Sequence, residues 1–463
     1  MEEKKGIKLP DAWVLLIGLA AVFAILSYIV PAGEYTRTLD EATGRMVVDP
    51  ASFHYIERTP IQFFQFFKII FQAFVKMADM IFFTLVVSGA FAVVRGTGAI
   101  DAGISHLVKS MSGREKMAIP LLVFVFSLFG AIMGCAEEML PFYPIVVSLC
   151  VALGFDAVTG VAIVLCGTGA GFAGALMNPF TIGVAHGISG LPLFSGMGYR
   201  FITYVAMVSI TAIYIWRYAG KVHADPSKSY LTVEERNNYE SADISIDFTG
   251  RHKAVLIGFV LGILWMAFGV VKLGFYFEEL AAVFLITGIA VGIIGGLSAD
   301  RIVAEMVKGM SEMVYGAFMI GVATSVSLVM QDGNIMDTII HALASLIQGF
   351  APVISAVLMF IVQTLINFVV PSGSGQATVS MPIMAPLADI VGITRQTAVL
   401  AFQFGDGLSN TIYPTVGYMM AALALGKVKY PTWLKFQWKL FLIWSLVAAV
   451  FVAIAAAIAW GPF

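Results

Sequence analysis

The sequence has few charged residues, and those it has are mostly confined to short segments. Only 12% of its 463 residues are Asp, Glu, Lys or Arg, and 59% are hydrophobic, whereas an average soluble domain carries about 25% charged residues. Apolar runs recur from Ala12 to Gly461, and roughly 20 apolar residues suffice to cross a bilayer. The scarcity of charge excludes a soluble protein and predicts an all-α polytopic membrane protein.

Other absences exclude whole classes of function. The three cysteines, Cys135, Cys150 and Cys166, lie in apolar segments and share no ligand spacing with histidines, so we expect reduced thiols, no metal site and no cofactor. The sequence contains no cluster of Lys and Arg residues suited to binding nucleic acid. There is no HExxH motif and no evident Ser/His pairing. We therefore expect the chain not to be an enzyme.

Hydropathy predicts about nine spans plus two hairpins. The predicted spans are 12–30, 80–95, 158–177, 201–216, 254–271, 280–297, 314–330, 397–412 and 436–460. Two further apolar blocks, 117–155 and 351–391, are too long for one crossing and carry Gly, Ser and Pro in the middle. We interpret each block as a re-entrant hairpin, which enters and leaves the membrane on the same side.

The charge distribution sets the predicted orientation. If the N-terminus lies in the cytoplasm, every predicted inside loop carries Lys or Arg, while the outside segments are balanced, acidic or nearly uncharged. That asymmetry agrees with the positive-inside rule. Two amphipathic stretches, 61–76 and 300–312, are expected to lie in the membrane interface, with an extension of the following helix as the alternative.

Two parts of the chain resemble each other in the same order. Gly98 matches Gly333, and Pro144 matches Pro382 at nearly the same offset. Because five crossings precede the second copy, the two copies have opposite orientations. The predicted parts are a first inverted repeat (1–220), a cytoplasmic linker (221–253), a connecting helix (254–275) and a second inverted repeat (276–463).

The repeat alignment brings two dissimilar hairpin tips into correspondence. One tip carries the acids Glu137 and Glu138, and the other carries "PSGSGQ". The latter supplies the candidate residues Ser372, Gly373, Ser374, Gly375 and Gln376. Gly and Ser let a chain leave helical geometry and expose N–H groups, and a half-helix N-terminus favours an anion. We predict a carboxylate-binding site there, with a plain helix break as the alternative.

The helix after each hairpin is also interrupted by polar residues. The first break, "MNPF", contains Asn178; the second, "FGDGLSNT", contains Asp406, Ser409, Asn410 and Thr411. Such side chains and freed carbonyl groups can hold a polar ligand or a small cation. They complete the set of predicted substrate-binding residues.

The acidic pair has no basic neighbour in its own span, because residues 117–199 contain no Lys or Arg. One charge at the bilayer centre costs on the order of 2.5–3.5 kcal/mol, so the pair needs water, protons or a ligand. Glu137, Glu138, Asp406 and Ser409 are therefore also candidates for coupling to Na⁺ or H⁺. Hydrated carboxylates at the surface are the alternative.

Long motifs in both halves resemble a known family. "GCAEEMLPFYPIVVSL", "MNPFTIGVAHGISGLPL" and "PSGSGQATVSMPIMAPLADIVGITRQTAVLAFQFGDGLSN" are similar to the YfcC branch of the anaerobic dicarboxylate carrier family, in the ion transporter superfamily. The resemblance implies a secondary transporter of the inner membrane, usually a homodimer, that moves small molecules by an elevator mechanism. Members of this branch include arginine/ornithine antiporters.

The resemblance leaves two classes of substrate open, and the residues favour one. Acids on one tip and exposed N–H groups on the other suit an amino acid with a positive side chain. The sequence therefore predicts a basic amino acid antiporter. The alternative is a Na⁺- or H⁺-coupled carrier of C4-dicarboxylates or other small carboxylates, in which the acids serve the driving ion. A channel is disfavoured, because inverted hairpin halves suit alternating access.

Overall fold

The computed structural model describes residues 12–40, 45–49, 51–110, 114–134, 136–237, 239, 248–273, 275, 277–347 and 349–461. Within these ranges seven helices are long and apolar enough to cross a membrane, or eight if the bent pair α2 (Phe63–Lys76) and α3 (Ala78–Gly96) is one span. Two of the seven are first arms of the predicted hairpins. A mostly helical, polytopic membrane protein is confirmed.

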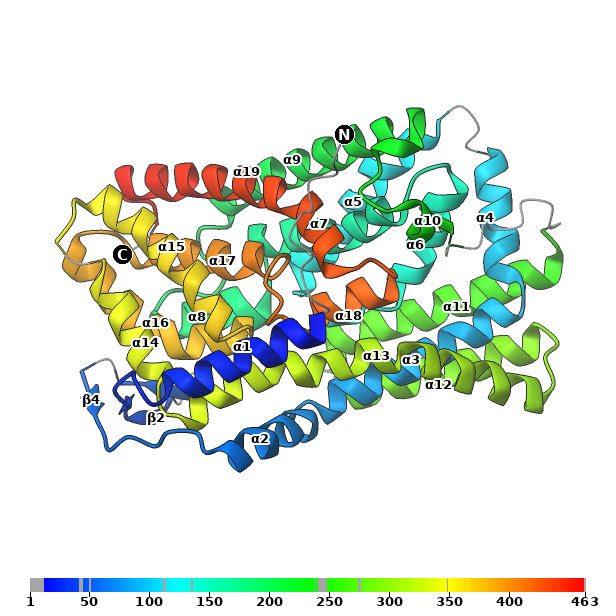
Figure 1. The fold of residues 1–463 in the computed structure, drawn as a ribbon. Helices are drawn as coiled ribbons and strands as arrows, with labels where there is room; N and C mark the ends of the chain where they lie inside the picture. The colour runs from blue at the N-terminus through cyan, green and yellow to red at the C-terminus, as the bar shows by residue number, and fades with distance from the viewer. Residues whose placement is uncertain are drawn as a thin grey trace, which may run out of the picture.

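One group of helices, which we call the flanking bundle, lies mostly along one long side of the molecule (Figure 1). Besides α2 and α3 it contains α1 (Ala12–Leu26), α4 (Ala99–Ser110), α11 (Gly250–Phe268), α12 (Phe277–Ile294), α13 (Ala299–Asp332) and α14 (Met336–Ser345). The long helix α13 packs against α1, α2 and α3 and is the central element of this bundle.

The second group, which we call the hairpin bundle, contains both predicted hairpins and both interrupted helices. Its members are α5 (Ala118–Leu128), α6 (Phe142–Ala152), α7 (Ala157–Gly174), α8 (Val184–Ile188), α9 (Met197–Ala224), α15 (Pro352–Val369), α16 (Gly373–Val391), α17 (Arg395–Ser409), α18 (Gly417–Leu425) and α19 (Tyr430–Ala457). In Figure 1, α9 and α19 run along the side opposite the flanking bundle. The principal contact between the bundles is α13 against α18.

Both hairpins have two helical arms and an irregular tip. In the block 117–155 the arms are α5 and α6, and the tip includes a π-helical turn (Phe129–Met133) and a 3₁₀ turn (Glu137–Met139). In the block 351–391 the arms are α15 and α16. Figure 1 shows the two hairpins extending from opposite ends of the molecule toward its middle.

Glycine allows one arm of each hairpin to pack closely on the interrupted helix of its own half. A Cβ on Gly171 of α7 would lie only 1.9 Å from the carbonyl oxygen of Ser127 on α5. A Cβ on Gly405 of α17 would lie 2.6 Å from Cβ of Gln363 on α15. No larger residue fits without backbone movement, so the same close contact holds each hairpin to its neighbouring helix.

The interrupted helices end for identifiable reasons. After Gly174, Ala175 is left-handed with a φ of 37°, which a residue with a Cβ rarely adopts. The guanidinium of buried Arg200 donates to the carbonyl oxygen of Ala175 at 3.0 Å, so it satisfies a group freed by the break. The starts of these helices are also capped. Asp156 is the N-cap of α7 and Thr394 is the N-cap of α17, and the side chain of each accepts a hydrogen bond from the backbone N–H three residues later.

Two expectations need correction. The stretch 300–312 is not a separate interfacial helix, because α13 continues through it without a break. The other amphipathic stretch, 61–76, does form a separate helix, because α2 and the following helix are bent by 53°. In addition, the segment after α1 contains four short strands that the all-α prediction did not include.

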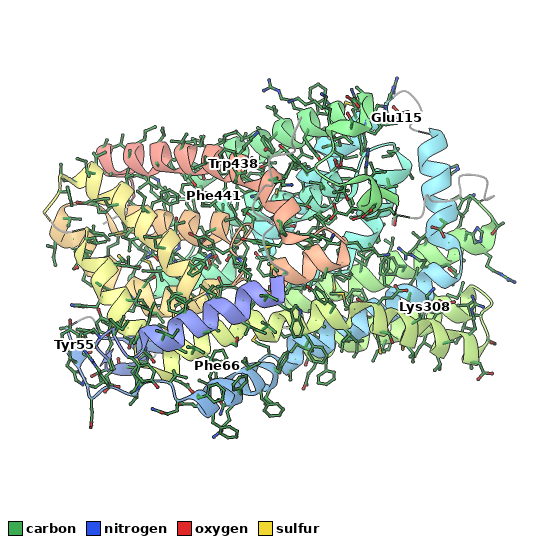
Figure 2. All side chains as sticks on the ribbon, viewed as in Figure 1. Tyr55, Phe66, Glu115, Lys308, Trp438 and Phe441 are labelled. Atoms are coloured by element: carbon green, nitrogen blue, oxygen red, sulfur yellow. The ribbon has the colours of Figure 1, made fainter. Side chains whose placement is uncertain are left out.

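The strands form two antiparallel pairs at one end of the molecule (Figure 1). β1 (Gly33–Glu34) pairs with β4 (His54–Tyr55), and β2 (Arg37–Asp40) pairs with β3 (Arg45–Val48). Arg37 joins them to α14 by a 2.8 Å salt bridge with Asp337. Tyr55 lies at this end and Lys308 at the other (Figure 2), where α10 (Val233–Asn237) of the linker also lies.

Candidate functional site

A cavity of about 430 Å³ lies where the two bundles meet. Both hairpin tips line it, together with residues of α13 and of the bend between α2 and α3. Its volume falls in the range typical of small-molecule sites. Because the predicted tips converge on this cavity, it is the candidate substrate site.

The first tip brings the two acids to the cavity. Gly134 ends the π-helical turn in a left-handed conformation with a φ of 70°, and a Cβ there would lie 2.3 Å from Oδ1 of Asn178. The chain then folds back so that the N–H of Ala136 donates to Glu138 Oε2 at 3.0 Å. Glu137 and Glu138 both line the cavity, and Glu138 is only 7% exposed. The acids are therefore mostly removed from solvent.

The second tip presents the start of a helix. Ser372 is the N-cap of α16, and its side-chain oxygen accepts from the N–H of Gly375 at 3.3 Å. Residues 371–375 all line the cavity. The first N–H groups of a helix have no partner within it, and its N-terminus carries partial positive charge. This side of the cavity therefore suits an anionic group.

Two further predicted residues lie behind the tips, outside the cavity lining. Asn178 is fully buried and caps the helical segment after the break in α7, because its Oδ1 accepts from the N–H groups of Phe180 and Thr181. Asp406 is fully buried on α17, and its Oδ2 has no hydrogen-bond partner. A Cβ on Gly373 would lie 2.9 Å from that oxygen. Gly373 lines the cavity, so this carboxylate lies close behind the cavity wall.

Asn410 lines the cavity, and a buried network behind it fixes its position. The side-chain amide of Asn367 donates to Asn410 Oδ1 at 2.8 Å and to Ser409 Oγ at 2.7 Å. Asn410 in turn donates to Asp406 Oδ1 at 3.2 Å. Ser409 belongs to this network rather than to the cavity wall, and Asn367 was not among the predicted site residues.

Gln376 and Thr411 lie farther from the cavity and make structural contacts. The Gln376 amide donates to the backbone oxygen and the side-chain Oε1 of Gln363, both at 2.8 Å, and so joins the two arms of the hairpin. Thr411 accepts from Gln437 at 2.7 Å, and its backbone oxygen accepts from Trp433 at 2.8 Å. These bonds attach the break after α17 to α19. Cys135 lies outside the described residues.

The flanking bundle contributes a wall of the cavity that was not predicted from the sequence. Thr324, Ser327 and Gln331 of α13 line the cavity, as does Lys76 at the end of α2. The three α13 residues recur at three- and four-residue spacing, which places them on one helix face, so a polar stripe in an apolar span was a detectable signal. Lys76 precedes residues 117–199, the span around the acids that contains no Lys or Arg.

The cavity is therefore divided electrostatically. Its charged lining residues are Glu137, Glu138 and Lys76 among the described part of the chain, which gives an excess of negative charge. The acids lie on the first tip, while the α16 N-terminus lies on the second. Such a site can hold a molecule that carries a positive group at one end and a carboxylate at the other.

The family model described as "C4-dicarboxylate anaerobic carrier" matches residues 9–457. The chain belongs to this family. It is 34% identical to the Escherichia coli (strain K12) protein named "Putative basic amino acid antiporter YfcC", over 92% of each chain. It is thus a membrane transporter that acts on small molecules.

Two solved transporter structures align with nearly the whole chain at low similarity. The YdaH transporter of Alcanivorax borkumensis has 15% identity and a TM-score of 0.43, with 98% of this chain and 100% of that one covered. Neisseria gonorrhoeae MtrF has 18% identity and a TM-score of 0.45, with coverages of 99% and 98%.

Proposed function

We propose that the protein is a secondary active antiporter of basic amino acids, of the arginine/ornithine type. The observation that carries the proposal is the divided cavity, with a pair of acids on one hairpin tip and a helix N-terminus on the other. The substrate's amino or guanidinium group contacts Glu137 and Glu138, and its α-carboxylate contacts the start of α16. The E. coli relative's name is consistent with this proposal.

The same proposal includes the mode of transport. The two halves are inverted repeats, and the hairpin bundle moves as an elevator against the flanking bundle, with α13 and α18 at the sliding contact. The protein is a homodimer of the inner membrane with its N-terminus in the cytoplasm. Na⁺ or H⁺ is the coupling ion if one is used, at Glu137, Glu138, Asp406 and Ser409, because Asp406 has an unpartnered oxygen.

A C4-dicarboxylate carrier is the second candidate. The description of the matching family favours it, and so does Lys76 in the cavity wall. Under this alternative, a dicarboxylate contacts Lys76 and the α16 N-terminus, and the acids bind the driving cation. The excess of negative charge in the cavity counts against it, because two carboxylates would face two acids.

Counterflow in proteoliposomes distinguishes the candidates. Vesicles loaded with ornithine, lysine, succinate or alanine are tested for uptake of labelled arginine and of labelled succinate, with and without Na⁺ and pH gradients. We expect arginine uptake to depend on internal ornithine or lysine. Exchange confined to succinate would refute the basic amino acid assignment.

A further inference from the structure

Lys76 reaches the cavity because of the bend between α2 and α3. It is in the last turn of α2, where a positive charge is favourable next to the free carbonyl groups. At the bend, Met77 also lines the cavity. A straight helix would continue past this point, so the bend places an ammonium group at the edge of the site.

The surroundings leave this ammonium group able to accept a ligand. Lys76 is exposed, and the structure gives it one weak hydrogen bond, to Gln331 Oε1 at 3.4 Å. It has no carboxylate within salt-bridge distance in the described structure. The amide of Gln331 orients the ammonium group without neutralising its charge. A ligand carboxylate can therefore contact Lys76 without displacing an ion pair.

Lys76 is also the one cationic side chain among the described residues of the cavity lining. The opposite charges in that lining are Glu137 and Glu138, which come from the other bundle. The α16 N-terminus lies in the same lining. A carboxylate between this N-terminus and an ammonium group gains both a dipole and a charge-assisted hydrogen bond.

We propose that Lys76 is a substrate-binding residue that contacts the ligand's carboxylate and makes the site selective for ligands that carry one. This inference rests on the proposed function and adds to it a specificity determinant from the flanking bundle. It predicts that decarboxylated amines such as agmatine are poor ligands, although they have the same cationic end as arginine.

The test is binding of arginine and agmatine to the full-length protein in detergent, measured by isothermal titration calorimetry. Losing a charge-assisted hydrogen bond costs about 1.5–3 kcal/mol, which corresponds to about 10- to 100-fold in affinity. In Lys76→Gln we expect arginine affinity to fall by about that factor while agmatine affinity changes little, so the ratio between the two decreases. Lys76→Arg should retain most of the ratio.

Lys68→Gln is the matched control. Lys68 lies about two turns earlier on the same helix, is also exposed, and lines a different depression. It should leave the arginine-to-agmatine ratio unchanged. Melting curves of all variants verify folding, and Lys76→Arg provides a second test if the glutamine variant is unstable. An unchanged ratio of arginine to agmatine affinity in Lys76→Gln overturns the proposal. If Lys76→Gln does not fold, loss of this ratio in Lys76→Arg overturns it.

The design separates this inference from the proposed function. If the wild type binds succinate and not arginine, the basic amino acid assignment fails. Succinate then replaces arginine as the probe for Lys76: weaker binding in Lys76→Gln with recovery in Lys76→Arg supports the contact with carboxylate, and equal binding in Lys76→Gln and wild type overturns it.

Discussion

The two hairpin tips line the same cavity but have opposite chemistry. The first leaves helical geometry at Gly134, and a 3₁₀ turn there carries Glu137 and Glu138 into the cavity. The second starts a helix at once, because Ser372 caps α16 directly after the break. At the first tip, the turn before the next helix presents side chains to the cavity. At the second tip, the helix starts directly and presents its first N–H groups. The two hairpins thus give the cavity an acidic wall and a wall formed by the N-terminus of a helix, which carries partial positive charge.

The largest expected effect comes from removing the acidic wall. Glu137→Gln combined with Glu138→Gln should lower arginine exchange more than about 100-fold, because two charge-assisted contacts, each worth about 1.5–3 kcal/mol, are lost. The measurement is initial-rate counterflow in proteoliposomes. Glu57→Gln, at an exposed position in the segment of short strands, is the control. Wild-type rates in the double variant would show that the acids do not contact the substrate.

The next effect comes from filling the close contact at the second tip. In Gly373→Ala the new methyl group would lie 2.5 Å from Cγ2 of Thr181 and 2.9 Å from Asp406 Oδ2. Either the α16 N-terminus or these side chains must therefore shift, and we expect arginine affinity to fall about 10-fold, in line with strain of 1–3 kcal/mol for overpacking. Gly198→Ala, where nothing lies within 4 Å, is the control. Equal affinities in both variants would contradict a rigid second tip.

Asp406 tests whether the groups behind the tips contribute to ion coupling. Asp406→Asn keeps the shape and removes the charge of the carboxylate that has an unpartnered oxygen. We expect arginine exchange to fall several-fold, with loss of its dependence on Na⁺ or on pH, whichever the wild type shows. Uptake under imposed gradients is the measurement. A variant with full ion dependence would exclude Asp406 from coupling, and Ser409→Ala tests its neighbour in the network.

The smallest effect is expected at the cap of α16. Ser372→Ala removes the oxygen that accepts from Gly375, and loss of such a cap costs about 1 kcal/mol. Arginine affinity should fall about fivefold, while Ser372→Asn, which can also cap and adds no charge, should recover part of it. Neutral citrulline, which keeps the carboxylate, should show the same loss. A loss limited to arginine would place Ser372 on the wrong side of the site.

The tips could be predicted from the sequence because their residues differ in polarity and helix propensity from the apolar segments around them. Two acids in an apolar block, and Gly and Ser where a helix should continue, are local signals. The interrupted helices were detectable for the same reason, from the Asn-Pro of Asn178 and the polar residues after Gly405. Each of the two apolar blocks does contain two helical segments and an irregular turn between them, and their re-entrant course in the membrane stays a prediction.

The cavity wall that the flanking bundle contributes could not be predicted from local sequence patterns. Lys76 and Gln331 are 255 positions apart and meet only because α2 packs along α13. Whether 300–312 is a separate helix or part of α13 depends on packing rather than on its amphipathic pattern. Similarly, Thr411 is polar and adjacent to Asn410, yet its hydroxyl contacts Gln437 of α19 rather than the cavity. Which neighbour a side chain after a helix end contacts is set by tertiary packing, and local composition does not show it.

The most direct test of the central claim compares arginine with citrulline, which has the same carboxylate and a neutral side chain. Affinities are measured for the wild type and for the combined Glu137→Gln and Glu138→Gln variant. If the first tip holds the cationic end, the wild type should prefer arginine by at least about 10-fold, and the preference should disappear in the variant. An arginine preference of equal size in both proteins would contradict the account.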